Sequence, residues 1–280
     1  MAEPDERGPK GDRQFITALA RGFEVLRCFS AAQPSLSATE LSRMIGLPQP
    51  TVWRLCHTLQ KIGMLRQNPE NGRYSVSVGV LGLGIASLQN VSLDAAARQE
   101  MRAIANTYGI AVSLCVPERH SLLVMAREQG NGSLVLNMSV GSRYEMAHST
   151  AGAAYLSQLP EIERREVFDT LADEEGEDWP QRREMLLGMI SECQDHGFLC
   201  SPGLLHQQIG SCAAPIRHPE PSQSAVLTAG GPVRVIREDL LRDEIGPRLL
   251  TLAQSLERAG PVAGFFHSSF LNAMGAGHDL

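Results

Sequence analysis

The apolar residues near the start of the chain recur with the period of a helix. Leu19, Phe23, Leu26 and Phe29 follow one another at intervals of four, three and three, which places them on one face of an amphipathic helix. The pattern predicts a helix over residues 17–31, with these four side chains turned toward a core. A glutamine and a proline then end it.

A second helix is predicted to begin at Ser37. Ser37 and Glu40 match the S-x-x-E capping box, in which each side chain caps the backbone N–H of the other. Gly46 suits the position just past the helix end. The apolar residues expected on its buried side are Leu41, Met44 and Ile45.

A third helix, over residues 50–62, has two chemically different sides. Pro50 fits its first turn, where a missing N–H costs nothing. One side is apolar and consists of Val52, Leu55, Cys56, Leu59 and Ile62. The other side offers basic, hydroxyl, imidazole and indole groups without an acid, from Thr51, Trp53, Arg54, His57, Thr58 and Lys61. Such groups suit phosphates and base edges, so the two helices and the turn at residues 46–49 predict a helix-turn-helix.

After residue 63 the pattern becomes that of a β-hairpin. Two strand-like pieces flank Asn71 and Gly72, a pair typical of a type I′ turn. A hairpin directly after a recognition helix is the wing of a winged helix-turn-helix. Arg66 and Arg73 lie on its arms, and we expect Arg73 to contact a phosphate or the minor groove.

The rest of the chain alternates between strand and helix patterns. An apolar segment with three glycines, residues 76–92, predicts a connecting helix that buries surface against another subunit or the second domain. Strands are then expected at residues 110–116, 121–129, 133–140, 209–216 and 223–230. Helices are expected at residues 94–108, 150–159, 161–171, 182–196 and 237–258, with an acidic loop at 172–180. This mixture indicates an α+β fold.

Composition and charge narrow the function. No apolar run among the 280 residues reaches the roughly 20 needed to span a bilayer, and the charged N-terminus lacks a secretory signal. We therefore expect a soluble cytoplasmic protein without a membrane partner. Residues 13–74 carry eight basic and three acidic side chains, whereas residues 75–280 have a net charge of −9. A basic first domain on an acidic second one is expected when only the first meets a polyanion.

The segment from Ser37 to Gly84 resembles the IclR family of bacterial transcription regulators. It has the family's T-E-L, then G-L-P-x-x-T-V-x-R-L-x-x-T-L, then G-x-L, and a wing strand that runs into L-x-L-G. Pro50 stands where the family often has Ser, which removes a possible phosphate-contacting hydroxyl. The residues expected to contact DNA are Gln49, Thr51, Trp53, Arg54, His57, Lys61, Arg66 and Arg73.

The resemblance continues to about residue 258, although Glu145 replaces the usual Pro and Ala153 the usual Lys or Arg. It implies a GAF-like α/β effector-binding domain and assembly as a homodimer or homotetramer. The expected organisation is a disordered N-terminus at 1–13, a winged helix-turn-helix at 14–77, a linker helix at 78–92, an effector-binding domain at 93–258 and a disordered tail at 259–280.

The resemblance also implies a set of effector-contacting positions. Several depart from the family, since Ser201 replaces an acidic residue, Ser211 replaces Cys, and Gly230 replaces Ser. The set offers hydroxyls and backbone N–H groups without a charge, which suit a carboxylate or a sugar-like polyol. Its members are Tyr144, Thr150, Ala151, Ser201, Ser211, Thr228 and Gly230.

The leading hypothesis is a regulator whose binding to a double-stranded operator is modulated by a small-molecule effector, such as a small organic acid. One alternative is an enzyme with His206 as base and Ser211 as nucleophile, but no G-x-S-x-G elbow surrounds the serine. Another is a ligand-free interaction protein whose winged helix docks a protein partner. His148, Cys200, His206 and Cys212 lack metal-ligand spacing. We expect no catalytic residues, metal or cofactor.

The cysteines at positions 28, 56, 115, 193, 200 and 212 include no C-x-x-C pair. We expect them to be reduced and to serve as small core residues, with a redox-sensing thiol as the alternative.

Overall fold

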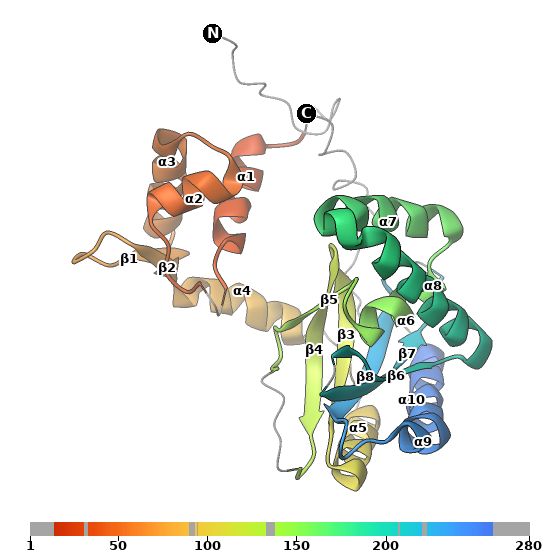
Figure 1. The fold of residues 1–280 in the computed structure, drawn as a ribbon. Coiled ribbons are helices and arrows are strands. Elements are labelled where there is room, and N and C mark those ends of the chain that lie inside the picture. The colour runs from red at the N-terminus through yellow and green to blue at the C-terminus, as the bar shows by residue number, and fades with distance from the viewer. Residues whose placement is uncertain are drawn as a thin grey trace. The chain divides into compact units, whose positions relative to one another are not determined.

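The computed structural model shows two compact units, one ending at Gln89 and one starting at Asn90 (Figure 1). The ends expected to be disordered, residues 1–13 and 259–280, lie outside the described residues except for Ala259, which is the last residue of a helix. The structure describes residues 14–30, 33–89, 93, 95–132, 138–206, 208–219 and 223–259, without the side chains of 86–89 and 204–206.

The first unit is a helix-turn-helix followed by a hairpin and one more helix. Its elements are α1 (Thr17–Arg27), α2 (Ala38–Ile45), α3 (Gln49–Lys61), β1 (Leu65–Gln67), β2 (Tyr74–Val76) and α4 (Val78–Gln89). The predicted capping box is present, because the Ser37 side chain accepts from the Glu40 N–H and Glu40 caps Ser37 in return. Gly46 ends α2 in the left-handed conformation, with φ +66°.

The core of this unit differs from the prediction on α1. Leu19 and Phe23 are 59% and 47% exposed, whereas Val25 is fully buried. The helix packs against α3 through the side that carries Val25, and Leu26 and Phe29 pack partly buried against the same core. Only the Leu19 and Phe23 part of the predicted apolar face is therefore turned away. Met44 and Ile62 are also exposed, and Ile62 lies just beyond the last residue of α3. The buried residues are Val25, Leu36, Leu41, Val52, Cys56, Leu59, Leu65 and Tyr74.

The wing hairpin is confirmed, but its type I′ turn is wrong. The strands pair from Leu65 with Val76 to Gln67 with Tyr74, which leaves a loop over residues 68–73. A type I′ turn needs positive φ at both central residues, and only Gly72 of the pair has it, at +69°. Two asparagine side chains hold this longer loop in shape, since Asn68 Oδ1 accepts from the Glu70 N–H and Asn71 Oδ1 from the Arg73 N–H.

The second unit is a six-stranded antiparallel sheet with helices on both faces, which confirms the predicted α+β class. The strand order is β5-β4-β3-β8-β7-β6. The strands are β3 (Ala111–Glu118), β4 (Ser121–Gln129), β5 (Arg143–Glu145), β6 (Leu199–His206), β7 (Ile209–Ile216) and β8 (Ala225–Pro232).

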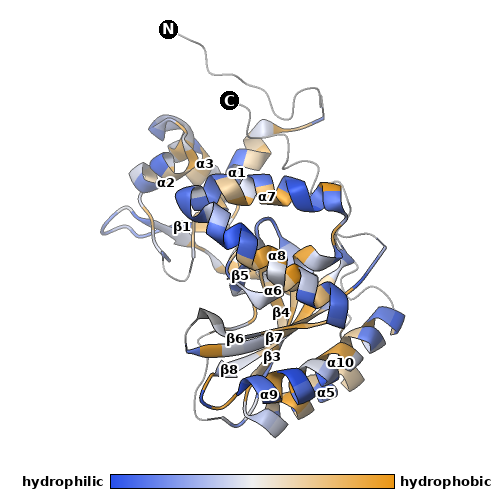
Figure 2. Cartoon of the chain, turned by 45° about the vertical axis from the view of Figure 1, so that its right-hand side comes forward, coloured by the Kyte–Doolittle hydropathy of each residue, from blue (hydrophilic) through white to orange (hydrophobic). Residues whose placement is uncertain are grey.

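Two apolar cores lie on opposite faces of this sheet. One forms against α5 (Ala95–Tyr108) and α10 (Gly246–Ala259). The other forms against α6 (Thr150–Gln158), α7 (Glu161–Glu175) and α8 (Trp179–His196). Figure 2 shows α5, α9 (Glu238–Leu240) and α10 on one side of the sheet and α6, α7 and α8 on the other.

Several predicted boundaries in this unit were wrong. The acidic segment 172–180 is helical throughout, because α7 runs to Glu175, a 3-10 turn spans Gly176–Asp178 and α8 begins at Trp179. Glu177 and Asp178 lie directly before α8, and acidic side chains are favourable next to a helix N-terminus. The helix expected over 237–258 contains a π-helical turn, Leu241–Ile245, between α9 and α10.

Strands β5 and β6 were not predicted. Of the strand predicted at 133–140, residues 133–137 lie outside the described residues and 138–140 are not in a strand. Strand β6 was missed because it contains Pro202 and Gly203, but it lies at the sheet edge and has a register irregularity there, where proline is tolerated.

Gly152 provides a test of how α6 meets the sheet. A Cβ built on Gly152 would collide with the Met146 carbonyl oxygen, whereas one on Gly188 in α8 meets nothing within 4 Å. Gly152→Ala should therefore lower the free energy of unfolding by about 1–3 kcal/mol, and Gly188→Ala should leave it unchanged or raise it slightly. Urea unfolding of both variants measures this, and equal stability would contradict the packing described.

Candidate nucleic-acid interface and effector site

Side-chain hydrogen bonds fix α2 and α3 against one another. Gln49 Nε2, at the start of α3, donates to Thr39 Oγ1 on α2 at 3.0 Å. Ser42 Oγ donates to the Leu47 carbonyl at 2.6 Å, which closes the turn between the helices. Gln49, a predicted DNA contact, is exposed, and its side-chain amide already makes a hydrogen bond within the helix-turn-helix.

The solvent side of α3 holds the other predicted residues of the recognition helix. Trp53, Arg54, His57 and Lys61 are exposed, and Thr51 is half-buried. Trp53 is 54% exposed, and its indole stacks on the His57 imidazole with ring centroids 5.4 Å apart and planes at 17°. This stack gives α3 a flat, rigid aromatic surface beside a guanidinium.

The two arginines of the wing are placed differently. Arg66 is exposed on β1, and its Nε donates to Ser75 Oγ at 2.9 Å. Arg73 is half-buried, and its Nη2 donates to the Ser35 carbonyl at 2.8 Å and lies 2.9 Å from Glu40 Oε2. In the described part of the chain, no ion pair involves Arg54, Lys61 or Arg66.

Glu40 is held in its ionised form by the groups around it. The backbone N–H and side chain of Ser37 and then the Arg73 guanidinium donate hydrogen bonds that lower the pKa of Glu40 to about 2. A carboxylate that accepts several hydrogen bonds in its charged form is expected to behave in this way. The capping box and the wing therefore share one negative charge.

The predicted effector residues gather on one face of the large sheet. Ser201 on β6 pairs with Ser211 on β7, and Ser211 pairs with Gly230 on β8. In the neighbouring row, Thr228 pairs with Ser113 on β3. Directly paired residues in a sheet point to the same side, and this side is the one covered by α6, because Ala213, which pairs with Thr228, packs in that core.

Hydroxyl groups bridge the sheet to the start of α6. Thr150 Oγ1, in the first turn of α6, donates to Ser211 Oγ at 3.1 Å. Thr228 Oγ1 donates to the Cys212 carbonyl at 3.2 Å. Ser201 Oγ is buried, with 1% of the residue exposed, and has no hydrogen-bond partner among the described residues. An unpaired buried hydroxyl is costly, so a bound polar molecule would relieve it.

The remaining two predicted residues flank this cluster. Ala151 is buried in the first turn of α6, beside backbone N–H groups at the positive end of the helix. Tyr144 on β5 is half-buried, and burial raises the pKa of its hydroxyl despite hydrogen bonds with Ser113 and Arg127.

The sequence-based expectation of an uncharged site missed Arg127. Its Nη1 donates to Ser113 Oγ at 3.1 Å and its Nη2 to Gln129 Oε1 at 3.2 Å. Arg127 and Ser113 are paired across β4 and β3, and a register shift lies between Leu114 and Cys115. With regular alternation, Arg127 would point to the face of the sheet opposite to the one that Leu122 and Val124 point to. The bulge instead turns Arg127 to the same face as these two residues. No signal in the single sequence marks this bulge.

The other titratable clusters do not form a second site. Cys56, Cys115, Cys193, Cys200 and Cys212 are buried and unbridged, as expected of core residues. Burial raises the pKa of the Cys212 thiol, which lies 3.3 Å from the Cys200 sulfur. In the described ranges, no three His, Cys, Asp or Glu residues are grouped to hold a metal ion.

His148 binds Glu175 through Nε2 at 2.7 Å, while the side chain of His206 lies outside the described residues. None of the helices that the structure describes is both long and apolar enough to cross a bilayer.

Comparison with known sequences matches both parts of the chain to regulators. Residues 18–69 match the family model described as the IclR helix-turn-helix domain. The chain is 28% identical over 256 residues to the HTH-type transcriptional regulator TsaQ1/TsaQ2 of Comamonas testosteroni, with 91% of each chain covered.

Solved structures extend the match to the whole fold. An IclR homologue from Microbacterium hydrocarbonoxydans, crystallised with 4-hydroxybenzoate, has a TM-score of 0.65 at 22% identity over 87% of this chain and 100% of that one. An IclR family transcriptional regulator from Brucella abortus has a TM-score of 0.85 at 35% identity, over 92% of this chain and 97% of that one. Since identity at this level extends over nearly the full length, the chain belongs to the IclR family of transcriptional regulators.

Proposed function

We propose that this regulator reads its operator with the exposed side of α3 and that a small carboxylate bound beside Arg127 modulates this binding. The observation that carries the DNA-binding part is the exposure of Trp53, Arg54, His57 and Lys61 on one side of a helix-turn-helix. In this motif the second helix enters the major groove. Arg54 and Lys61 add charge, and the stacked pair of Trp53 and His57 adds a shaped apolar surface.

Gln49 and Thr51 at the start of α3 and Arg66 on the wing complete the proposed contact set. Their positions suit phosphates on either side of the groove, because helix starts and wings are the parts that reach the backbone. The sequence preference is assigned to Arg54, whose guanidinium can bind a guanine through two hydrogen bonds.

The effector is proposed to be a small monocarboxylate. Arg127 supplies a guanidinium, the first turn of α6 supplies N–H groups, and Ser201 supplies a buried hydroxyl without a protein partner. A carboxylate can accept hydrogen bonds from all three kinds of donor at once, and its charge is opposite to that of the guanidinium. The 4-hydroxybenzoate bound by the Microbacterium relative belongs to this chemical class.

A homodimer is proposed to cover the apolar surface of the first unit. Most of the exposed large apolar residues in the described part of the chain belong to this unit. On α1 they are Leu19 and Phe23, with Ile16 directly before the helix, and on α4 they are Val78, Leu81, Leu83 and Ile85. Two of these residues, Leu19 and Phe23, are spaced like the buried side of an amphipathic helix. A second copy of the chain would bury the side chains that remain exposed in the single chain.

We propose no catalytic activity for the chain, and we assign it to the cytoplasm, where its chromosomal target lies. Among the described side chains, which do not include that of His206, the hydroxyl of Ser211, the nucleophile of the alternative hypothesis, is hydrogen-bonded to Thr150. The relatives reported above are regulators, which supports the same conclusion.

The recognition helix is tested by Arg54→Ala in the full-length protein. The variant should bind a duplex from upstream of its own gene roughly 5- to 150-fold more weakly, because a bidentate contact to a base contributes roughly 1–3 kcal/mol. Binding to a scrambled duplex should change much less. Arg237→Ala, in the second unit and paired with Asp239, is the control. Undiminished specific binding at fixed salt would contradict the assignment.

The effector class is tested by a thermal-shift screen of aromatic and aliphatic monocarboxylates, each beside its amide. A carboxylate should raise the melting temperature, by an amount that corresponds to about 2.7 kcal/mol at a hundred times its Kd, and its amide should not. Arg127→Gln should remove the shift, whereas Arg143→Gln, whose parent arginine pairs with Glu118, should keep it. Equal shifts from acid and amide would rule out the guanidinium as the anchor.

The dimer is tested by Phe23→Glu, which places a charge on the exposed face of α1. Sedimentation velocity should show a shift toward smaller species, because an unpaired charge is costly at an apolar interface. Met44→Glu changes an equally exposed apolar residue on α2 and should leave the assembly intact. Unchanged sedimentation of Phe23→Glu would assign the interface to another surface.

A further inference from the structure

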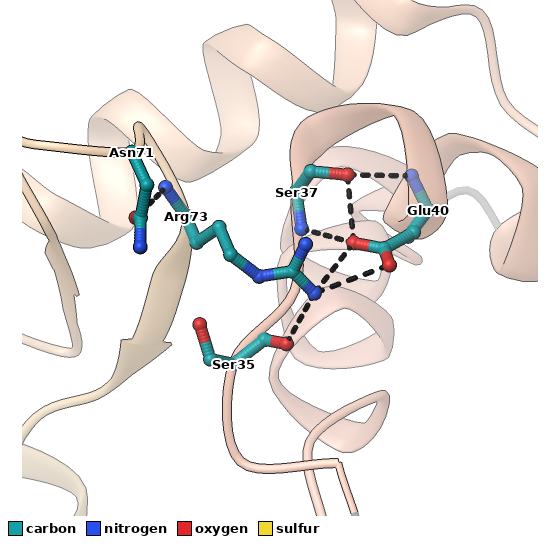
Figure 3. Close-up of polar contacts among 5 residues, drawn as sticks. All are labelled: Ser35, Ser37, Glu40, Asn71 and Arg73. Carbon is teal, nitrogen blue, oxygen red and sulfur yellow. Dashed lines mark hydrogen bonds and ion pairs between the residues drawn. The ribbon is translucent and has the colours of Figure 1, made fainter.

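The side chain of Arg73 points into the DNA-binding unit. Arg73 directly precedes β2, and Figure 3 shows its guanidinium turned toward the Ser35 carbonyl and the Glu40 carboxylate. The Nη2 atom lies 2.8 Å from Ser35 O and 2.9 Å from Glu40 Oε2. One guanidinium thus bonds the chain before α2 and the first turn of α2 at the same time.

Backbone hydrogen bonds strengthen the same junction. The Tyr74 N–H donates to the Leu36 carbonyl at 2.7 Å, and the Leu36 N–H donates to the Tyr74 carbonyl at 2.9 Å. Tyr74 is buried in the core. The Arg73 N–H in turn donates to Asn71 Oδ1 at 3.0 Å. Hydrogen bonds therefore hold both the backbone and the guanidinium of Arg73.

Releasing Arg73 to a phosphate would have an electrostatic cost. Glu40 would lose its cationic partner while a polyanion approached the same surface, and its carboxylate would repel the phosphates. Arg66, Arg54 and Lys61 have no ion pair in the described part of the chain, so they can meet phosphates without this penalty.

Resting on the proposed DNA-binding function, we propose that Arg73 is a positioning residue that clamps the wing to α2 and shields Glu40 from DNA. The clamp sets the distance between the wing and α3, and the phosphate contacts come from other basic groups. This assignment replaces the contact that the sequence alone suggested for Arg73.

The test uses the full-length protein, a generic 30-base-pair duplex and a series of salt concentrations. Arg73→Gln and Glu40→Gln each break the clamp, and glutamine at position 40 still fits the capping box. Each variant should bind roughly 3- to 10-fold more weakly at fixed salt, and the double variant no more weakly than either, as expected of coupled residues. The slope of log affinity against log salt should not change, because the groups that neutralise phosphates all remain.

Two controls calibrate the slope. Arg66→Gln should reduce its magnitude by about 0.9 for each phosphate that is no longer neutralised, and Glu70→Gln, an acid on the wing loop, should not reproduce the weaker binding. A reduced slope for Arg73→Gln, or tighter binding by Glu40→Gln, would overturn the proposal, since both are expected if Arg73 neutralises a phosphate. Lower thermal stability with unchanged affinity would also overturn it.

Hydrogen exchange of the wing amides tests the clamp without DNA. Residues 68–76 should exchange faster in Arg73→Gln and Glu40→Gln, by similar factors, and Arg73→Lys should recover most of the protection because lysine can still pair with Glu40. Unchanged exchange would refute the clamp. Failure of the unmodified protein to bind any duplex would instead refute the proposed function, and the exchange result would still decide the role of Arg73.

Discussion

The carboxylate of Glu40 connects the three parts of the DNA-binding unit. It accepts from the N–H and hydroxyl of Ser37, the N-cap of α2, and from Arg73, which directly precedes the second wing strand. Because the pKa of this carboxyl group is lowered to about 2, Glu40 stays ionised at neutral pH. Because α2 carries α3 through the Gln49–Thr39 bond, the wing and the recognition helix have a common reference point.

Local chemistry in the sequence was sufficient for the features closest to this charge. The capping box, the glycine that ends α2 and the two sides of α3 depend on residues within one or two turns, and all were predicted. The apolar face of α1 failed for a different reason. Leu19 and Phe23 have the period of a core face, but periodicity does not say whether the core belongs to the same chain, and here both are exposed.

Contacts between residues far apart in the chain could not be predicted from the sequence pattern. Arg73 meets Glu40 across 33 positions of the chain, and an arginine on a wing gives no sign of which way it points. The residues on the central strands that were predicted to contact an effector do lie on one face of the sheet, through pairs such as Ser201–Ser211 and Ser211–Gly230. Arg127 was absent from that set, because its direction depends on one irregularity in the pairing of β3 with β4.

That irregularity decides which face of the sheet each later residue of β4 points to. Beyond the bulge, Arg127 faces the side of the hydroxyl cluster, while Glu128 faces α5 and is held there by Arg98 and Arg102. Met125 is the extra residue, because Val124 pairs with Cys115 and Ala126 pairs with Leu114. If the same sequence alternated without a bulge, Arg127 would turn to the α5 side and Glu128 would take its place on the side of the hydroxyl cluster. One unpaired residue therefore decides whether this face of the sheet carries a base or an acid.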